Sequence, residues 1–178
     1  MSHSTTERED RTESRDAPGR GTHRILFVCT GNTCRSPMAE AIASTLAGKG
    51  TVPAVEARSA GVGAFPGSPP SGGAVRAASK RGIDLRSHRA TLLTRREIEW
   101  ADLILTMSPG HLLRVSELGG GDRATLLTAY AEGTETGAAS GSIPDPIGGS
   151  DEEYDRTYRR LEALVEKVFH RLADEDAG

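Results

Sequence analysis

Short apolar runs alternate with amphipathic stretches along most of the chain. Residues 24–29 (RILFVC) and 102–107 (DLILTM) are almost continuously apolar, which is typical of strands that are buried on both faces. Residues 54–61 (AVEARSAG) and 123–129 (RATLLTA) predict two further strands. The pattern therefore predicts four strands that are well separated along the chain.

Helical patterns lie between these strands and after the last one. After the first strand, Ser36 is a suitable N-cap, Pro37 suits the first helical position, and Met38, Ile42 and Leu46 recur at helical spacing. Further helices are predicted at residues 71–81, after a capping box at residues 94–97, after the Ser-Pro pair at 108–109, and from a second capping box at 150–153. The last of these is the longest, and its apolar face comprises Tyr154, Tyr158, Leu161, Val165, Val168 and Leu172.

This alternation predicts the α/β class. Apolar strands that alternate with helices form a parallel sheet joined by right-handed crossovers, so we expect a single domain with a four-stranded parallel sheet flanked by helices on both faces. A chain of 178 residues is long enough for one domain with a sizeable core, which we place at residues 24–178. Residues 1–23 are charged and hydroxyl-rich with few apolar side chains, so this N-terminal tail is expected to be disordered.

Both cysteines of the chain lie in one short segment, residues 28–37 (VCTGNTCRSP), between the first strand and the first helix. A disulfide, part of a metal site, or a nucleophile with a companion thiol would each account for this placement. Ligands of open parallel sheets bind beyond the carboxyl ends of the strands, so this segment occupies a favoured position for a functional site.

Composition narrows this choice. The net charge is −3 with both signs mixed along the chain, so no nucleic-acid partner is expected. No apolar stretch reaches the roughly 18–20 residues of a membrane span, and the N-terminus lacks the apolar part of a secretory signal. We therefore expect no membrane contact and a cytoplasmic location, where thiols stay reduced. The two cysteines and five scattered histidines match no zinc spacing, so neither a metal nor another cofactor is expected, and a reactive thiol is favoured.

The residues around Cys29 suit phosphoryl chemistry. Backbone N–H groups at the start of a helix, helped by Gly31, can close around an anion, and the helix dipole favours negative charge. Arg35 adds a planar guanidinium that can hold two phosphoryl oxygens. The same positive field is expected to lower the thiol pKa, so the loop that binds a phosphoryl group would also form the thiolate that attacks it.

The string CTGNTCRSP resembles the signature of the low-molecular-weight protein-tyrosine-phosphatase family. The resemblance extends over about residues 24–172, including RSAG from Arg58, ADLILTM from Ala101 and the Asp-Pro pair at 145–146. It implies that Cys29 is the nucleophile, Arg35 the phosphate clamp and Asp145 the general acid. It implies a phosphate-binding loop formed by Thr30, Gly31, Asn32, Thr33, Cys34 and Ser36.

Within that loop the resemblance assigns further roles. Asn32 orders the loop, and the hydroxyl of Ser36 stabilises the thiolate. Cys34 would be a redox partner that traps oxidised Cys29 as a reversible disulfide. The implied partners are phosphorylated protein substrates, and the chain is expected to be a monomer.

Simpler interpretations of the same residues remain open at this stage. Cys29 could be a small buried residue at a strand end, Cys34 could serve packing alone, and Asp145 could be a turn residue, since Asp-Pro favours turns. His88 could be a switch or an ordinary hydrogen-bonded histidine.

Other functions share parts of this pattern. Arsenate reductase has the same fold but needs further cysteines to relay a disulfide, and the chain has none after Cys34. A catalytically silent phosphate-binding module would lack one of the three catalytic residues, and none is missing. A nucleotide-binding fold would need a G-x-G-x-x-G pattern after the first strand.

The substrate is predicted from the rim of the pocket. Tyrosine-specific members of the family usually carry an aromatic pair after the late Asp-Pro and a bulky aliphatic residue before the second cysteine, whereas this chain has Ile147, Gly148 and Thr33. These residues resemble the protein-arginine-phosphatase branch. Phe65 stands where tyrosine-specific members place an aromatic pocket residue, which leaves tyrosine phosphatase as the alternative. Thr33, Phe65 and Ile147 are the predicted substrate-pocket residues.

Overall fold

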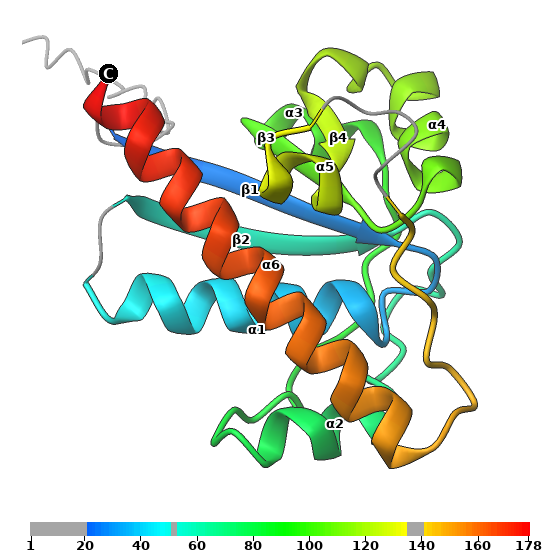
Figure 1. The fold of residues 1–178 in the computed structure, drawn as a ribbon. Coiled ribbons are helices and arrows are strands. Elements are labelled where there is room, and N and C mark those ends of the chain that lie inside the picture. Colours follow the sequence, from blue (N-terminus) through cyan, green and yellow to red (C-terminus); the bar gives the residue numbers. More distant parts are fainter. Residues whose placement is uncertain (1–20, 51–52, 135–140) are drawn as a thin grey trace, which may run out of the picture.

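The computed structural model describes residues 21–50, 53–134 and 141–178, and Figure 1 shows the arrangement of their helices and strands. The elements, in chain order, are β1 (Thr22–Cys29), α1 (Arg35–Gly48), β2 (Ala54–Gly61), α2 (Gly72–Ser79), α3 (Arg95–Trp100), β3 (Leu103–Thr106), α4 (Pro109–Glu117), the 3₁₀ helix η1 (Gly121–Arg123), β4 (Ala124–Leu126), α5 (Leu127–Glu132) and α6 (Asp151–Ala177).

The four strands form one parallel sheet in the order β2-β1-β3-β4. The predicted α/β class and the four-stranded parallel sheet are confirmed. β1 lies between β2 and β3, so its end adjoins the ends of both neighbours. This placement brings the segment after β3 close to the segment after β1, although they are about eighty residues apart in the sequence.

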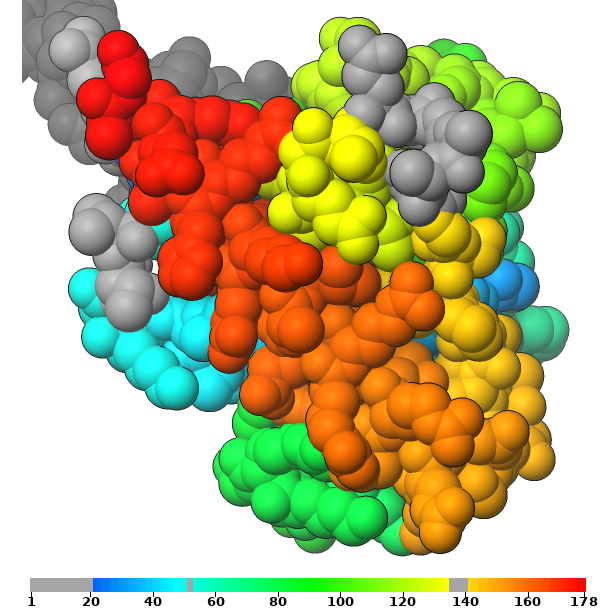
Figure 2. Space-filling model, viewed as in Figure 1, coloured from blue at the N-terminus to red at the C-terminus, as the bar shows by residue number. Residues whose placement is uncertain are grey.

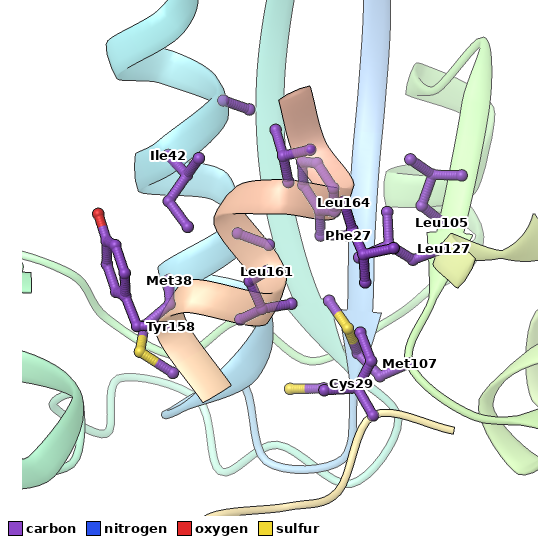
Figure 3. Close-up of a cluster of buried hydrophobic side chains, with 14 of the residues drawn as sticks. Phe27, Cys29, Met38, Ile42, Leu105, Met107, Leu127, Tyr158, Leu161 and Leu164 are labelled. Carbon is purple, nitrogen blue, oxygen red and sulfur yellow. The ribbon is translucent and has the colours of Figure 1, made fainter. Parts of the chain in front are cut away.

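Alternating side chains of β1 enter two separate hydrophobic clusters. Ile25, Phe27 and Cys29 lie in the larger cluster, which α1, α2, α5 and α6 cover, as the close-up in Figure 3 shows for Phe27 and Cys29. Leu26 and Val28 lie in the smaller cluster beneath α3 and α4. Because the sheet is covered on both faces, its central strand is apolar at every position from Ile25 onward.

α6 is the longest helix and crosses the front of the molecule in Figures 1 and 2, and its buried side chains belong to the larger cluster. The predicted capping box is present, since the Ser150 hydroxyl accepts from the N–H of Glu153 and the Glu153 carboxylate accepts from the N–H of Ser150. The six residues predicted for its apolar face are all buried, namely Tyr154, Tyr158, Leu161, Val165, Val168 and Leu172. The capping box therefore predicted the start of α6, and helical periodicity predicted its buried face.

Three predicted boundaries are wrong. α1 begins at Arg35 with Cys34 at its N-cap, because the Ser36 hydroxyl bonds inside the site and does not cap the helix. The fourth strand ends at Leu126, since the following apolar residues are buried as the short helix α5. β1 begins at Thr22, so the predicted tail ends too late, while the predicted disorder of residues 1–20 lies outside the described residues.

Among the described residues, no helix combines the length and the apolar character that crossing a membrane requires.

Candidate active site

The segment between β1 and α1 forms a tight loop at the carboxyl end of the central strand. Cys29 is the last residue of β1, and α1 begins six residues later at Arg35. The N-cap residue Cys34 makes no side-chain capping bond, so the N–H of Arg35 has neither an intrahelical partner nor a side-chain cap, while the N–H of Ser36 points toward the Cys29 sulfur. Together with the helix dipole, these N–H groups form the anion-binding end that the sequence predicted.

The thiol of Cys29 lies at the base of this loop and is almost completely buried. Its Sγ lies 2.8 Å from the Ser36 Oγ, and the backbone N–H groups of Asn32 and Ser36 also point toward it. Burial raises the pKa of the thiol above its ordinary value, and this effect exceeds the lowering by Ser36, Arg35 and Asn32. The predicted lowering of the pKa is therefore wrong for the net shift, because the sequence shows the positive groups but not the depth of the sulfur.

Asn32 organises the loop from within. It is the one non-glycine residue with a positive φ, 54°, in the described part of the chain, a conformation that asparagine tolerates better than most residues. Its Nδ2 donates to Ser36 Oγ at 2.8 Å and to Ser59 Oγ at 2.9 Å, and its Oδ1 accepts from the N–H of Thr91 at 2.8 Å. Because Asn32 donates to the Ser36 oxygen, the Ser36 hydroxyl proton can go to the Cys29 sulfur at 2.8 Å or to the Ala60 carbonyl at 3.5 Å, and a thiolate at Cys29 would be the nearer acceptor.

This hydrogen-bonded network continues away from the nucleophile. The Ser59 hydroxyl donates to the carboxylate of Glu40, a residue of α1. Burial raises the pKa of the Glu40 carboxyl, partly offset by the bond from Ser59 and the nearby imidazole of His88. His88 Nε2 lies 2.8 Å from the Asn32 carbonyl oxygen and donates to it. Of the two interpretations of His88, the structure favours the ordinary hydrogen-bonded histidine.

Arg35 lies across the loop from Cys29, and its side chain is buried. Its Nη1 donates to the Ile143 carbonyl at 2.8 Å, and its Nη2 lies 3.4 Å from both Thr30 Oγ1 and Asp145 Oδ2. Its Nε is buried and has no partner in the described part of the chain. The guanidinium is thus fixed at one edge, and its Nε is left as a donor for an oxygen of a bound anion.

Asp145 reaches the site from the segment that precedes α6. Its Oδ2 contacts Arg35, and its Oδ1 accepts from the N–H of Ile147 at 3.2 Å, as in an Asx turn. The carboxylate is about 38% exposed, so it faces the opening of the site. The structure brings together the three residues that the sequence predicted as catalytic, from segments more than one hundred residues apart.

His111 is a site residue that the sequence analysis missed. It lies in the first turn of α4, its Nε2 is 2.9 Å from Thr30 Oγ1, and its Nδ1 is 3.0 Å from Ser108 Oγ. Burial and the positive charge of Arg35 lower its pKa to about 4, while Asp145 acts in the opposite direction. The Ser-Pro helix start after β3 was a usable signal, because β3 neighbours β1 and its end adjoins the phosphate loop.

The low pKa of His111 predicts a loss of stability in mild acid. Histidine in an unfolded chain has a pKa near 6.5, so between about pH 6.5 and pH 4 the unfolded state binds the proton that the folded state excludes. The free energy of unfolding should therefore fall as the pH drops through this window, with roughly 1–3 kcal/mol attributable to this residue. Urea unfolding at several pH values would measure the slope for the native chain and for His111→Gln. An equal slope in both proteins would contradict the assignment.

Of the predicted substrate-pocket residues, Thr33 belongs to the loop, and Phe65 and Ile147 lie on two segments that contact it. The main chain between β2 and α2 is bonded to the loop twice, by the N–H of Gly63 to the Thr30 carbonyl and by the N–H of Ser71 to the Thr33 carbonyl. Phe65 lies on this bonded segment and is 83% exposed, and Ile147 is 59% exposed beside the acid-bearing segment. Both apolar side chains are thus exposed at the surface, while Thr33 is half-buried.

Cys34 is a free, buried thiol on the same loop as Cys29. Its Sγ lies 3.1 Å from Ser71 Oγ and 3.4 Å from the Tyr154 hydroxyl. These two contacts hold the sulfur against α2 and α6. No group of three or more His, Cys, Asp or Glu side chains placed to hold a metal ion occurs within the ranges that the structure describes.

Comparisons with known proteins agree with this site. Residues 24–177 match the family "Low molecular weight phosphotyrosine protein phosphatase". A protein-arginine-phosphatase of Geobacillus stearothermophilus is 38% identical over 155 residues, covering 86% of this chain and 98% of the relative. A low molecular weight protein-tyrosine-phosphatase, PtpB of Staphylococcus epidermidis, is 35% identical over 153 residues. This match covers 82% of this chain and 96% of the relative.

Solved structures give the same result. The YwlE arginine phosphatase from Geobacillus stearothermophilus superposes with a TM-score of 0.77 at 38% identity, covering 87% of this chain and 96% of that one. A low molecular weight protein tyrosine phosphatase from T. tengcongensis superposes with a TM-score of 0.76 at 38% identity. The match covers 83% of this chain and 98% of that one. The chain therefore belongs to the low molecular weight phosphotyrosine protein phosphatase family and is a cysteine-based phosphatase.

Proposed function

We propose that this phosphatase removes phosphoryl groups from arginine side chains of proteins, with Cys29, Arg35 and Asp145 as its catalytic residues. The contacts of Arg35 are the main support for these roles. Its guanidinium contacts both the phosphate loop and the Asp145 carboxylate, while its Nε has no partner in the described part of the chain. A phosphoryl group held by this guanidinium would lie between a thiol and a carboxyl group. These are the nucleophile and the acid that phosphoryl transfer through a covalent intermediate requires.

The first step forms a phosphocysteine. The thiolate of Cys29 attacks phosphorus while the loop N–H groups and Arg35 hold the three non-bridging oxygens. The bond between phosphorus and the leaving nitrogen or oxygen breaks, and the Asp145 carboxyl gives its proton to the leaving group. Ser36 donates to the sulfur at 2.8 Å, which offsets part of the cost of a buried thiolate.

The second step restores the enzyme. Water attacks the phosphocysteine, the Asp145 carboxylate accepts a proton from that water, and the bond between sulfur and phosphorus breaks to release phosphate and the thiolate. No redox change occurs in either step. Asp145 therefore serves as acid first and as base second, which suits a carboxylate that is partly exposed and already oriented by Arg35.

Phosphoarginine is the proposed substrate because of the rim. Thr33 offers a hydroxyl where a bulky aliphatic residue would otherwise stand, and it can bond a guanidinium nitrogen or a water. Ile147 supplies an apolar but non-aromatic wall, so a phenyl ring would meet at most one aromatic wall, Phe65. The protein-arginine-phosphatase relatives support the same choice. Tyrosine phosphatase is the second candidate, supported by the exposed ring of Phe65 and by the tyrosine-phosphatase relatives.

Thr33→Ile tests this choice of substrate. Removing the hydroxyl and filling its space should lower kcat/KM for phosphoarginine peptides about tenfold, which corresponds to roughly 1.4 kcal/mol of transition-state stabilisation. Hydrolysis of phosphotyrosine peptides should be unchanged or faster, because the aromatic ring uses no bond from Thr33. The measurement is the specificity constant for both peptides with the native chain and the variant.

Thr33→Ser is the matched control, since it keeps the hydroxyl and should keep the phosphoarginine activity. A native chain that strongly prefers phosphotyrosine, together with equal losses on both substrates in Thr33→Ile, would make this an ordinary tyrosine phosphatase.

The second cysteine predicts reversible inactivation by peroxide. Oxidised Cys29 should be trapped by Cys34 as a disulfide, and reductant should then restore activity. Cys34→Ser should instead be inactivated irreversibly, because its nucleophile can proceed to sulfinic acid. Activity after peroxide and then dithiothreitol, with the disulfide checked by mass spectrometry, measures this. Equal recovery of activity in both proteins would show that Cys34 is not the thiol that traps oxidised Cys29.

The proposed chemistry also indicates the cellular location, the partners and the oligomeric state of the enzyme. A buried thiol nucleophile needs a reducing compartment, which supports the cytoplasm, where phosphorylated proteins would be its partners. The mixed surface charge supports neither nucleic acid nor a membrane surface as a partner. Because the phosphate loop, acid and rim come from one chain, a monomer would be sufficient for activity.

A further inference from the structure

A pocket lies between the segment that carries Asp145 and the start of α6. Its walls come from residues 143–146 and from the first turns of α6, which adjoin each other in Figures 1 and 2. Its lining comprises Ile143, Pro144, Asp145, Pro146, Glu153, Arg156, Thr157 and Arg160. Its volume of about 160 Å³ would hold roughly five water molecules at about 30 Å³ each, or one side chain of similar bulk.

Two arginines of this pocket have no partner among the residues that the structure describes. Arg156 and Arg160 lie one turn apart on α6, are exposed, and make no ion pair or hydrogen bond with any residue in the described ranges. Arg159, between them in sequence, is by contrast paired with Asp155. Two positive charges four residues apart repel each other and destabilise a helix slightly, and a bound anion between Arg156 and Arg160 would reduce this repulsion.

The two carboxylates of the pocket are already engaged. Asp145 contacts Arg35, and Glu153 accepts the N–H of Ser150 in the capping box of α6. Glu153 keeps its negative charge, but the charged groups of the pocket with unused hydrogen-bond donors are the guanidinium groups of Arg156 and Arg160. The other walls are mainly apolar, with two prolines and an isoleucine.

We infer that this pocket is a subsite for a carboxylate side chain of the substrate protein, an aspartate or glutamate within a few residues of the phosphorylated one. This inference rests on the proposed function. The pocket shares Asp145 with the catalytic site, so its occupant lies beside the reacting residue in the same bound segment. Guanidinium groups bind carboxylates through paired N–H donors, and the apolar walls suit the methylene groups of that side chain.

The test measures binding and does not depend on turnover. In a Cys29→Ala background, which has no nucleophile, phosphoarginine and phosphotyrosine peptides would carry one glutamate at each of three positions on either side of the phosphorylated residue, with glutamine peptides for comparison. Fluorescence anisotropy should show about three- to tenfold tighter binding of the best glutamate peptide than of its glutamine partner. In Arg156→Gln/Arg160→Gln this ratio should fall below about twofold.

Arg95→Gln/Lys167→Gln is the matched control. It removes the same charge from two exposed residues that have no partner in the described part of the chain and lie outside the pocket. The control should keep the preference for glutamate. Equal binding of glutamate and glutamine peptides to the parent, or an equal loss in both double variants, would overturn the inference. Hydrolysis of an aryl phosphate by the native chain separately tests the phosphatase chemistry, so the two failures are distinguishable.

Discussion

Arg35→Lys is expected to lower kcat/KM at least about 10³-fold on every phosphorylated substrate. The guanidinium makes contacts in three directions, to the Ile143 carbonyl, to Thr30 and to Asp145, and it keeps Nε for the substrate. A lysine ammonium is a single point of charge on a flexible stem and cannot bond in all these directions at once. The loss should be large for good and poor leaving groups alike, because Arg35 holds the phosphoryl group that all of these substrates share.

Asp145→Asn provides the contrast for this measurement. An amide cannot supply the proton, so turnover should fall steeply for poor leaving groups and only slightly for activated aryl phosphates, whose leaving groups need little protonation. Specificity constants across a series of aryl phosphates would separate the two patterns. If Arg35→Lys kept a kcat/KM within tenfold of the native value, the guanidinium would not have the proposed role of holding the phosphoryl group. An unchanged series in Asp145→Asn would require another acid.

Features that depend on local sequence were predicted well. The capping box of α6 and its buried face follow from residues three and four positions apart, and the structure confirms both. The four strands follow from apolar runs, and parallel pairing follows from the helices between them. The positions of Cys29 and Arg35 on one loop also follow, because the whole loop is contiguous in the sequence.

Features that depend on tertiary contacts were not predicted from local patterns. The capping rule assigned the Ser36 hydroxyl to a helix cap, whereas the family resemblance placed it at the thiolate, and in the structure it bonds Cys29 and Asn32. His111 was missed because its proximity to Thr30 depends on β3 pairing with β1. The depth of the Cys29 sulfur, which reverses the sign of its pKa shift, depends on packing by distant helices.

The support of the phosphate loop from β2 is a further feature that depends on tertiary packing. Gly61, the last residue of β2, pairs with Cys29 in the sheet, and the N–H of Gly63 bonds the Thr30 carbonyl at 3.0 Å. A Cβ atom added at Gly61 would lie only 2.4 Å from the Thr30 carbonyl oxygen and 2.8 Å from the Asn32 nitrogen. Both are main-chain atoms of the phosphate loop, so they cannot move aside as a flexible side chain would.

Gly61→Ala should therefore displace the loop while leaving every catalytic side chain in the sequence. We expect it to lower the free energy of unfolding by about 1–3 kcal/mol through overpacking, and to lower kcat/KM about 10²-fold, since small displacements of a catalytic loop have effects of that order. Gly63→Ala is the matched control, because its Cβ would lie 4.0 Å from the same Thr30 oxygen, an ordinary contact distance. Urea unfolding and aryl phosphate hydrolysis would be compared for both variants. A Gly61→Ala protein that matches Gly63→Ala in stability and activity would show that the loop adapts to the added methyl group without cost.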